Sequence, residues 1–122
     1  MEQSREEKAA QLIARMKQAR GYIYPQWEYL AKTNPDFAEL YQQVYERCFG
    51  EGENLPAKYR ELGPIALLAY KGHVDAVAEH MKRAIRLGAT KGELLDAVMT
   101  LLIPGGAPTM LTGVSALMKL EE

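Results

Sequence analysis

The sequence HVDAVAEHMKRAIRL at residues 73–87 decides the fold class. On a helical wheel with about 100° per residue, its aliphatic residues fall on one stripe and its charges on the opposite face. The stripe consists of Val74, Val77, Ala78, Met81 and Ile85. The charged face consists of Asp75, Glu79, Lys82 and Arg86. Acidic residues come early, basic residues come late and Gly88 follows as a C-cap, so the segment predicts an amphipathic α-helix that packs against a core.

The sequence after this segment predicts two more helices. Thr90 and Glu93 have the spacing of a capping box, which indicates a helix start. Residues 97–118 then run for 22 residues without a charge, long enough to cross a bilayer. Pro104 and Pro108 lack N–H donors, however, and lipid does not tolerate exposed broken backbone. We therefore expect two buried helices joined by a tight corner, the second over residues 107–120, with another subunit covering part of them.

The sequence before residue 73 also has helical spacing, and strand signals are weak. Expected helices cover residues 2–20, a short segment that opens at Pro25, residues 37–48 and residues 56–70. The last of these should bend at Gly63-Pro64, because Pro64 cannot donate a hydrogen bond to residue 60. The chain is thus predicted to be an all-α protein of about six to seven helices.

Composition excludes several classes of protein. The 122 residues carry 15 Lys+Arg against 16 Asp+Glu, a formal charge of −1, so no basic surface indicates nucleic-acid binding. One cysteine, Cys48, allows no intramolecular disulfide, Cys-rich zinc site or CxxC pair within one chain. The N-terminal sequence MEQSREEKAAQ has no features of a secretory signal. We expect a cytoplasmic location and no membrane partner.

Three side chains are candidates for chemistry. His73 and His80 are seven residues apart and share one edge of their helix, among apolar neighbours. On the preceding helix Glu61 falls beside Ile65 and Leu68. A glutamate among aliphatic side chains is costly to ionise unless a cation or hydrogen-bond donors meet it. Glu61 and His80 would then form a partly desolvated acid–base pair.

Structural roles explain the same residues equally well at this point. His80 fits a hydrogen-bonded histidine at an interface, and Glu61 fits a link to His80 or to Lys58. His73 fits a residue near a helix start. Cys48, at a helix end, is interpreted as an inert small hydrophobe.

A metal or phosphate site is not expected. Glu61, His73 and His80 offer a carboxylate and two imidazoles, but seven residues of straight helix separate the two histidines by about 10.5 Å. Ligands of one ion must converge on bonds of about 2.1 Å. The Gly105-Gly106 pair lacks the frame of a phosphate-binding loop. The sequence therefore predicts no cofactor.

Two phrases carry a family resemblance. LPAKYREL at residues 55–62, then His80, then LGATKGEL at residues 87–94, resemble the carboxymuconolactone decarboxylase / alkylhydroperoxidase D-like (AhpD-like) superfamily. The resemblance implies an all-helical protomer that assembles into homotrimers or homohexamers. It implies a single domain over residues 1–122, with an N-terminal helical region at 1–50 and the family core at 55–120.

The peroxidase branch of this superfamily has the reactive pattern Glu…CxxCxxxH. The resemblance assigns its glutamate to Glu61 and its histidine to His80, and places its two cysteines on His73 and Ala76. Thiol peroxidase chemistry needs both sulfurs, so that activity is expected to be lost.

The lactone decarboxylase branch works without the cysteine pair. The resemblance therefore implies carboxy-lyase-like acid–base chemistry, decarboxylation or proton transfer, on a small carboxylated or lactone substrate, with Glu61, His80 and His73 as site residues. Two alternatives stay open: a non-catalytic structural or regulatory homo-oligomer, and a residual AhpD-like peroxidase or redox role.

Overall fold

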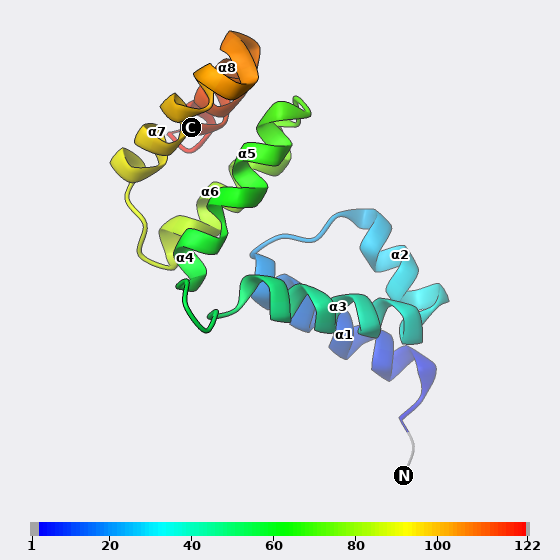
Figure 1. Cartoon of the computed structure of the whole chain (residues 1–122). Coiled ribbons are helices and arrows are strands. Elements are labelled where there is room, and N and C mark those ends of the chain that lie inside the picture. Colours follow the sequence, from blue (N-terminus) through cyan, green and yellow to red (C-terminus); the bar gives the residue numbers. More distant parts are fainter. Residues whose placement is uncertain (1–2, 122) are drawn as a thin grey trace. The chain divides into compact units, whose positions relative to one another are not determined.

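The computed structural model describes residues 3–121 of the chain, and every regular element within them is an α-helix (Figure 1). The all-α prediction is therefore confirmed. The chain divides into two compact units, the first ending at Gly50 and the second beginning at Glu51. The division falls between the two regions expected from the sequence, whereas their union into a single domain stays a prediction.

The first unit contains three helices. They are α1 (Arg5–Arg20), α2 (Pro25–Thr33) and α3 (Pro35–Phe49). Ser4 caps α1 in a capping box with Glu7, and the Asn34 side chain accepts a hydrogen bond from the Phe37 N–H at the start of α3. Pro25 and Pro35 occupy first-turn positions, where a missing N–H costs nothing. Local chemistry at the helix ends thus sets where each helix begins.

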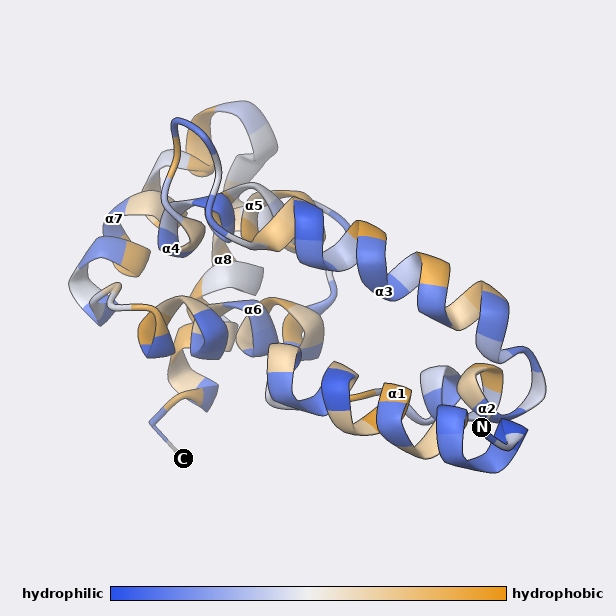
Figure 2. Ribbon diagram, turned by 90° about the horizontal axis from the view of Figure 1, so that it is seen from below, coloured by the Kyte–Doolittle hydropathy of each residue, from blue (hydrophilic) through white to orange (hydrophobic). Residues whose placement is uncertain are grey.

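A small apolar core holds the first unit together. Its buried residues are Leu12, Met16, Ile23, Ala31 and Ala38. Hydrophilic and hydrophobic residues alternate along α1 and α3, as expected of helices that bury one face (Figure 2). The Arg20 guanidinium lies over the rings of Tyr45 at 4.1 Å and Tyr41 at 5.2 Å, and the Tyr41 ring stacks on Trp27. Cation–π contacts therefore supplement a modest aliphatic core.

The second unit contains five helices. They are α4 (Ala57–Arg60), α5 (Leu62–Tyr70), α6 (Val74–Arg86), α7 (Lys91–Thr100) and α8 (Leu102–Lys119). The expected helix over residues 56–70 is two helices, because the chain breaks at Glu61 rather than bending at Gly63-Pro64. Pro64 has no N–H for the carbonyl of Arg60, so the missing bond interrupts the helix one turn before the proline. The described residues accordingly form eight helical segments, of which α4 and α5 together take the place of one expected helix.

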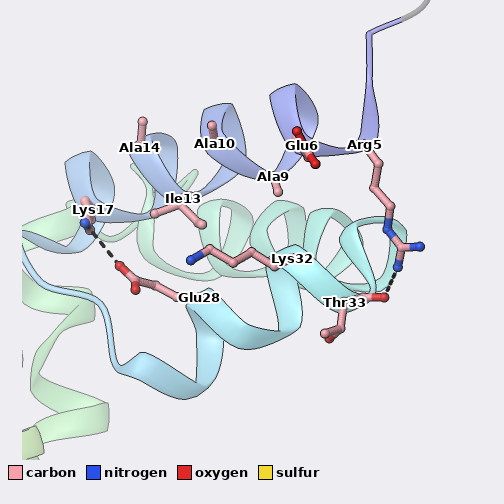
Figure 3. A pocket seen from close by; sticks show the side chains of 10 residues that line it. All are labelled: Arg5, Glu6, Ala9, Ala10, Ile13, Ala14, Lys17, Glu28, Lys32 and Thr33. Carbon is pink, nitrogen blue, oxygen red and sulfur yellow. Dashed lines mark hydrogen bonds and ion pairs between the residues drawn. The ribbon is translucent and has the colours of Figure 1, made fainter.

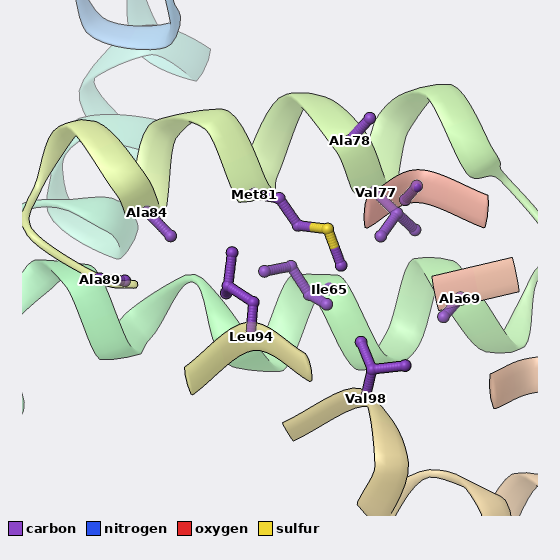
Figure 4. Packing of buried hydrophobic residues seen from close by; sticks show 10 residues of the cluster. Ile65, Ala69, Val77, Ala78, Met81, Ala84, Ala89, Leu94 and Val98 are labelled. Atoms are coloured by element: carbon purple, nitrogen blue, oxygen red, sulfur yellow. The ribbon is translucent and has the colours of Figure 1, made fainter. Parts of the chain in front are cut away.

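The predicted stripe of α6 faces the core of the second unit. Val77, Ala78 and Met81 are buried, and Val74 and Ile85 pack against the same cluster. Figure 4 shows Met81 of α6, Ile65 of α5 and Leu94 and Val98 of α7 pointing toward one another. Alanines at positions such as 69, 78 and 84 keep the helix axes close. The amphipathic prediction for this helix is confirmed.

The uncharged segment turns a corner at Gly106, whose φ of 82° lies in the left-handed region that favours glycine. The predicted corner is thus present, although α8 starts at Leu102 and continues across the kink. Within one chain the two helices are only partly buried, since Ile103 is 88% and Met118 64% exposed. Their cover by another subunit stays a prediction. Within residues 3–121, no helix is long and apolar enough to span a membrane.

Candidate functional site

The structure brings Glu61 and His80 together. Glu61 lies at the break between α4 and α5, and its side chain is fully buried. Its Oε2 lies 2.6 Å from Nδ1 of His80, and its Oε1 accepts a hydrogen bond from Nη1 of Arg83. One carboxylate therefore holds an imidazole and a guanidinium at the same time.

Local structure explains this arrangement. His80 and Arg83 are three residues apart on α6, so they project from one face of the helix. Glu61 lies at the helix break that Pro64 imposes. It directly precedes α5, which packs on α6. The core contact between Ile65 and the α6 stripe fixes the distance between the two elements. The site is thus held by rigid helices on both sides.

Burial and charge are balanced at Glu61. A buried carboxylate loses its hydration, which costs roughly several kcal/mol unless cations or hydrogen-bond donors compensate the charge. The Arg83 guanidinium meets Oε1, and Nδ1 of His80 meets Oε2. The structure thus supplies the cation and the donors that the sequence analysis required for an ionised glutamate in this place.

The contact couples the state of the imidazole to that of the carboxylate. An ionised carboxylate only accepts hydrogen bonds, so with Glu61 ionised it is Nδ1 of His80 that carries the proton of this contact. In the neutral ring Nε2 is then the basic nitrogen. The His80 side chain is 21% exposed and the Arg83 side chain 13%, against none for Glu61. The cluster can therefore exchange a proton at the imidazole while its carboxylate stays away from water.

His73 does not join this contact. It is the N-cap residue of α6, it is exposed, and it precedes His80 by about 10 Å of helix rise. Its role in a site stays a prediction. Lys58, the other partner considered for Glu61, lies with Nζ 4.9 Å from the centre of the Tyr59 ring.

The interpretation of Cys48 as a small hydrophobe is wrong, because the residue is exposed on α3. A side chain at this position of the helix has no core to pack against. The burial that the interpretation requires is therefore absent, and Cys48 contributes a thiol to the surface of the first unit.

Sequence reasoning missed Arg83. The charge pattern assigned it only to the basic C-terminal end of a helix. The signal was nevertheless present: Arg83 follows His80 by three residues, and a glutamate among aliphatic side chains needs a cation. That need, combined with the spacing, made Arg83 a candidate partner of Glu61.

Other candidate ligand sites were sought in the described part of the chain. It holds no group of three His, Cys, Asp or Glu side chains placed to bind a metal ion. A groove of about 900 Å³ lies along α1 and α2 of the first unit, and Figure 3 shows Ala9 and Ile13 of α1 on the side that faces α2. Lys17 and Glu28 form an ion pair at 3.2 Å in it, and Arg5 donates to the Thr33 carbonyl. None of Glu61, His73 and His80 lines this groove.

Comparison with known proteins adds a family match. Residues 35–119 match the carboxymuconolactone decarboxylase family. An uncharacterized protein from Cupriavidus necator is 31% identical over 86 residues, which are 70% of this chain and 75% of that protein. An uncharacterized protein from Methanocaldococcus jannaschii is 28% identical over 92 residues, which are 75% of this chain and 85% of that protein.

A solved structure has the same fold. It is the crystal structure of a candidate carboxymuconolactone decarboxylase from Burkholderia xenovorans LB400, with a TM-score of 0.78. The similarity covers 97% of this chain and 94% of the other, at 20% sequence identity. At that identity the likeness shows the fold alone. The family match begins at Pro35, the first residue of α3, and so starts before residues 55–120, the range of the resemblance noted in the sequence.

Proposed function

The chain belongs to the carboxymuconolactone decarboxylase family, and we propose that it is an enzyme performing cofactor-independent acid–base chemistry on a small carboxylated or lactone substrate. The observation that carries the proposal is the fully buried Glu61 carboxylate, which contacts both His80 and Arg83. Such a compensated charge behind a partly exposed imidazole is a frequent form of proton-transfer site.

In this proposal His80 is the catalytic residue and Glu61 orients it. The neutral ring takes a proton at Nε2 from a substrate carbon next to a carbonyl, and the electron pair of the broken C–H bond moves into an enolate. Glu61 stabilises the imidazolium that forms, through the 2.6 Å contact at Nδ1. The imidazolium then returns the proton to another carbon or to oxygen. Each proton-transfer role contributes about 10²–10⁴ in rate.

Decarboxylation uses the same groups in a different order. The bond between a substrate carbon and its carboxylate breaks, CO₂ leaves, and the electron pair stays on the carbon as an enolate conjugated with the lactone or keto carbonyl. The His80 imidazolium protonates that carbon, and solvent restores the proton to His80. His73, exposed at the start of α6, is proposed as a residue at the rim of this site.

The experiment compares His80→Gln and Glu61→Gln with a control, Glu79→Gln, which removes an acid on α6 whose partner is Lys82. Probes are a carboxymuconolactone and a panel of small lactones and 2-oxo acids. Release of CO₂ is measured, together with exchange of carbon-bound protons in D₂O by proton NMR. We expect both site variants to lose at least about 10² in kcat/KM and the control to keep its activity. Near-normal kcat/KM in His80→Gln, which changes a partly exposed residue, would show that the pair is structural.

A peroxidase or redox role is the weaker alternative, because the sequence contains a single cysteine. We expect no peroxide-dependent turnover with a dithiol reductant. Turnover that Cys48→Ser abolishes would contradict this.

Assembly into a homo-oligomer, which the non-catalytic alternative requires, is favoured by a different observation. Helices α5, α7 and α8 expose large apolar side chains, namely Leu67, Tyr70, Met99, Ile103, Leu111 and Met118. We propose that copies of the chain cover this surface in a homotrimer or homohexamer. Light scattering at micromolar concentration should give a multiple of 13.7 kDa, the mass of one chain. A single-chain mass would reject the assembly, while turnover of any probe would reject the purely structural role.

A further inference from the structure

We infer that Arg83 is a positioning residue that selects the tautomer of His80 by keeping Glu61 ionised. The effect on turnover rests on the proposed function. The tautomer itself is a property of the protein without substrate, so it can be measured separately.

The two oxygens of the Glu61 carboxylate contact different partners. Oε1 of Glu61 accepts from Arg83 and Oε2 lies 2.6 Å from Nδ1 of His80. Glu61 is fully buried, and its two partners are 13% and 21% exposed. Each oxygen therefore has a nitrogen opposite it, and a change at one oxygen acts on the contact at the other.

The short contact to His80 is compatible with two proton arrangements. A carboxylate at Glu61 only accepts, which puts the proton of the neutral ring on Nδ1 and makes Nε2 the base. A carboxylic acid at Glu61 donates from Oε2 to Nδ1, and the neutral ring then carries its proton on Nε2. In the second arrangement Nε2 is a donor and cannot take a proton from a substrate. The charge state of Glu61 thus decides the function of His80.

Burial and Arg83 act on that charge state in opposite directions. Removal of Glu61 from water favours the uncharged acid, whereas a cation in contact with Oε1 favours the carboxylate. The two lysines nearest in sequence have other contacts: Lys82 binds Glu79 at 3.2 Å, and Lys58 lies over the Tyr59 ring. Arg83 therefore supplies the positive charge that meets Glu61.

The experiment measures the tautomer of His80 by long-range ¹H–¹⁵N NMR in the wild type, Arg83→Met and Arg83→Lys. Spectra are taken at a pH at which the ¹⁵N shifts themselves show both rings to be neutral. Arg83→Met keeps an unbranched apolar side chain of similar reach and removes the charge; Arg83→Lys keeps the charge. Exposed His73 serves as the reference in each spectrum, and His73→Gln assigns the two rings.

We expect the Nδ1–H form to dominate at His80 in the wild type and in Arg83→Lys. In Arg83→Met the ratio of Nδ1–H to Nε2–H should fall at least tenfold, while the His73 signals stay unchanged. An unaltered ratio in Arg83→Met, or an Nε2–H form in the wild type, would overturn the inference. If Arg83→Met does not fold, Arg83→Gln provides the same comparison at this partly exposed position.

Kinetics separate this inference from the proposed function. On any substrate found with the panel, Arg83→Met should lower kcat about tenfold or more with little change in KM, and Arg83→Lys should restore most of it. A tautomer shift without any substrate turnover would leave the inference intact and reject the enzyme. Turnover that depends on His80 but not on Arg83, with an unaltered tautomer, would reject the inference and leave the enzyme.

Discussion

The two units of this chain each contain a cluster of three charged or ionisable side chains, and the two clusters differ in burial. In the first unit Arg15 binds Glu39 at 2.6 Å and Glu46 at 3.1 Å, and all three side chains are about 40% exposed. In the second unit Glu61 binds His80 and Arg83 and is fully buried. An exposed ion pair contributes little to folding, whereas a buried one must compensate a large desolvation cost.

The difference indicates where packing alone does not account for the sequence. The second unit has a cluster of ten buried apolar residues, which a well-packed aliphatic side chain at position 61 would extend at no electrostatic cost. The first unit has five and gains further stability from Arg20 over aromatic rings. A buried charge in the unit with the larger core is therefore the feature that most needs a functional explanation.

The largest expected effect is on folding stability when each cluster loses its carboxylate. Glu61→Ala leaves Arg83 and His80 without their buried partner and should lower the free energy of unfolding by about 3 kcal/mol or more. The matched change in the first unit, Glu39→Ala, should cost about 1 kcal/mol or less, because solvent and Glu46 remain available to Arg15. Urea unfolding followed by circular dichroism measures both.

Equal losses in the two variants would break the comparison. In that case the buried cluster would be no more costly to disrupt than a surface pair. Glu61→Met refines the result, since it refills the volume: recovery of stability without recovery of activity would separate packing from function.

Much of the second unit follows from its sequence. The stripe of α6 and the capping box of Thr90 and Glu93 are local patterns, and both are present in the structure. The pairing of Glu61 with His80 was also expected, since both residues were predicted to face apolar surroundings on neighbouring helices. Local periodicity is sufficient for these features because it fixes which face of a helix is buried.

Other features depend on how helices meet. The break at Glu61 results from a hydrogen bond that Pro64 cannot make, and periodicity places a bend only near the proline itself. Arg83 lies both at the basic end of α6 and on the same face as His80. Only the position of α5 beside α6 decides that its guanidinium contacts Glu61. The exposure of Cys48 likewise depends on packing that residue spacing does not specify.

The positions of the glycines are a second, smaller difference between the two units. The glycines of the first fifty residues, Gly21 and Gly50, lie at helix ends, while Gly113 of α8 lies against Val98 of α7. A Cβ at Gly113 would come 2.7 Å from Cγ1 of Val98, so Gly113→Ala should cost about 1–3 kcal/mol. Gly92→Ala in α7 is the control: outside the neighbouring backbone the added carbon meets Oγ1 of Thr90 at an ordinary 3.8 Å, and stability should rise by up to about 1 kcal/mol.

Thermal unfolding of both variants decides whether α7 and α8 pack as closely as described. The double variant Gly113→Ala with Val98→Ala should recover part of the loss, because the colliding methyl groups are gone. Destabilisation of the same size in Gly92→Ala would mean that both effects arise from the helix backbone rather than from the contact with Val98.

The smallest expected effect concerns exposed acids of the second unit, which should behave like the surface pairs of the first. The backbone N–H of Thr90 lowers the pKa of Glu93 below its ordinary 4.5, and Lys119 lowers that of Asp75 below 3.8. A lowered pKa stabilises the fold fully above the ordinary value, and the contribution is lost as pH falls through the folded-state value. The stability advantage of the wild type over Glu93→Gln should therefore decrease as pH falls below about 4.5. Its advantage over Asp75→Asn should decrease as pH falls below about 3.8.

Salt separates the two cases. In about 1 M salt the stability difference for Asp75 should shrink strongly, because its partner is an exposed ammonium, while the difference for Glu93 should persist, because its partner is a backbone amide. Melting temperatures between pH 3 and 6 at two salt concentrations, about 0.1 M and 1 M, measure both. A Glu93 difference that vanishes with salt, or that grows as pH rises, would contradict the assignment to the helix cap.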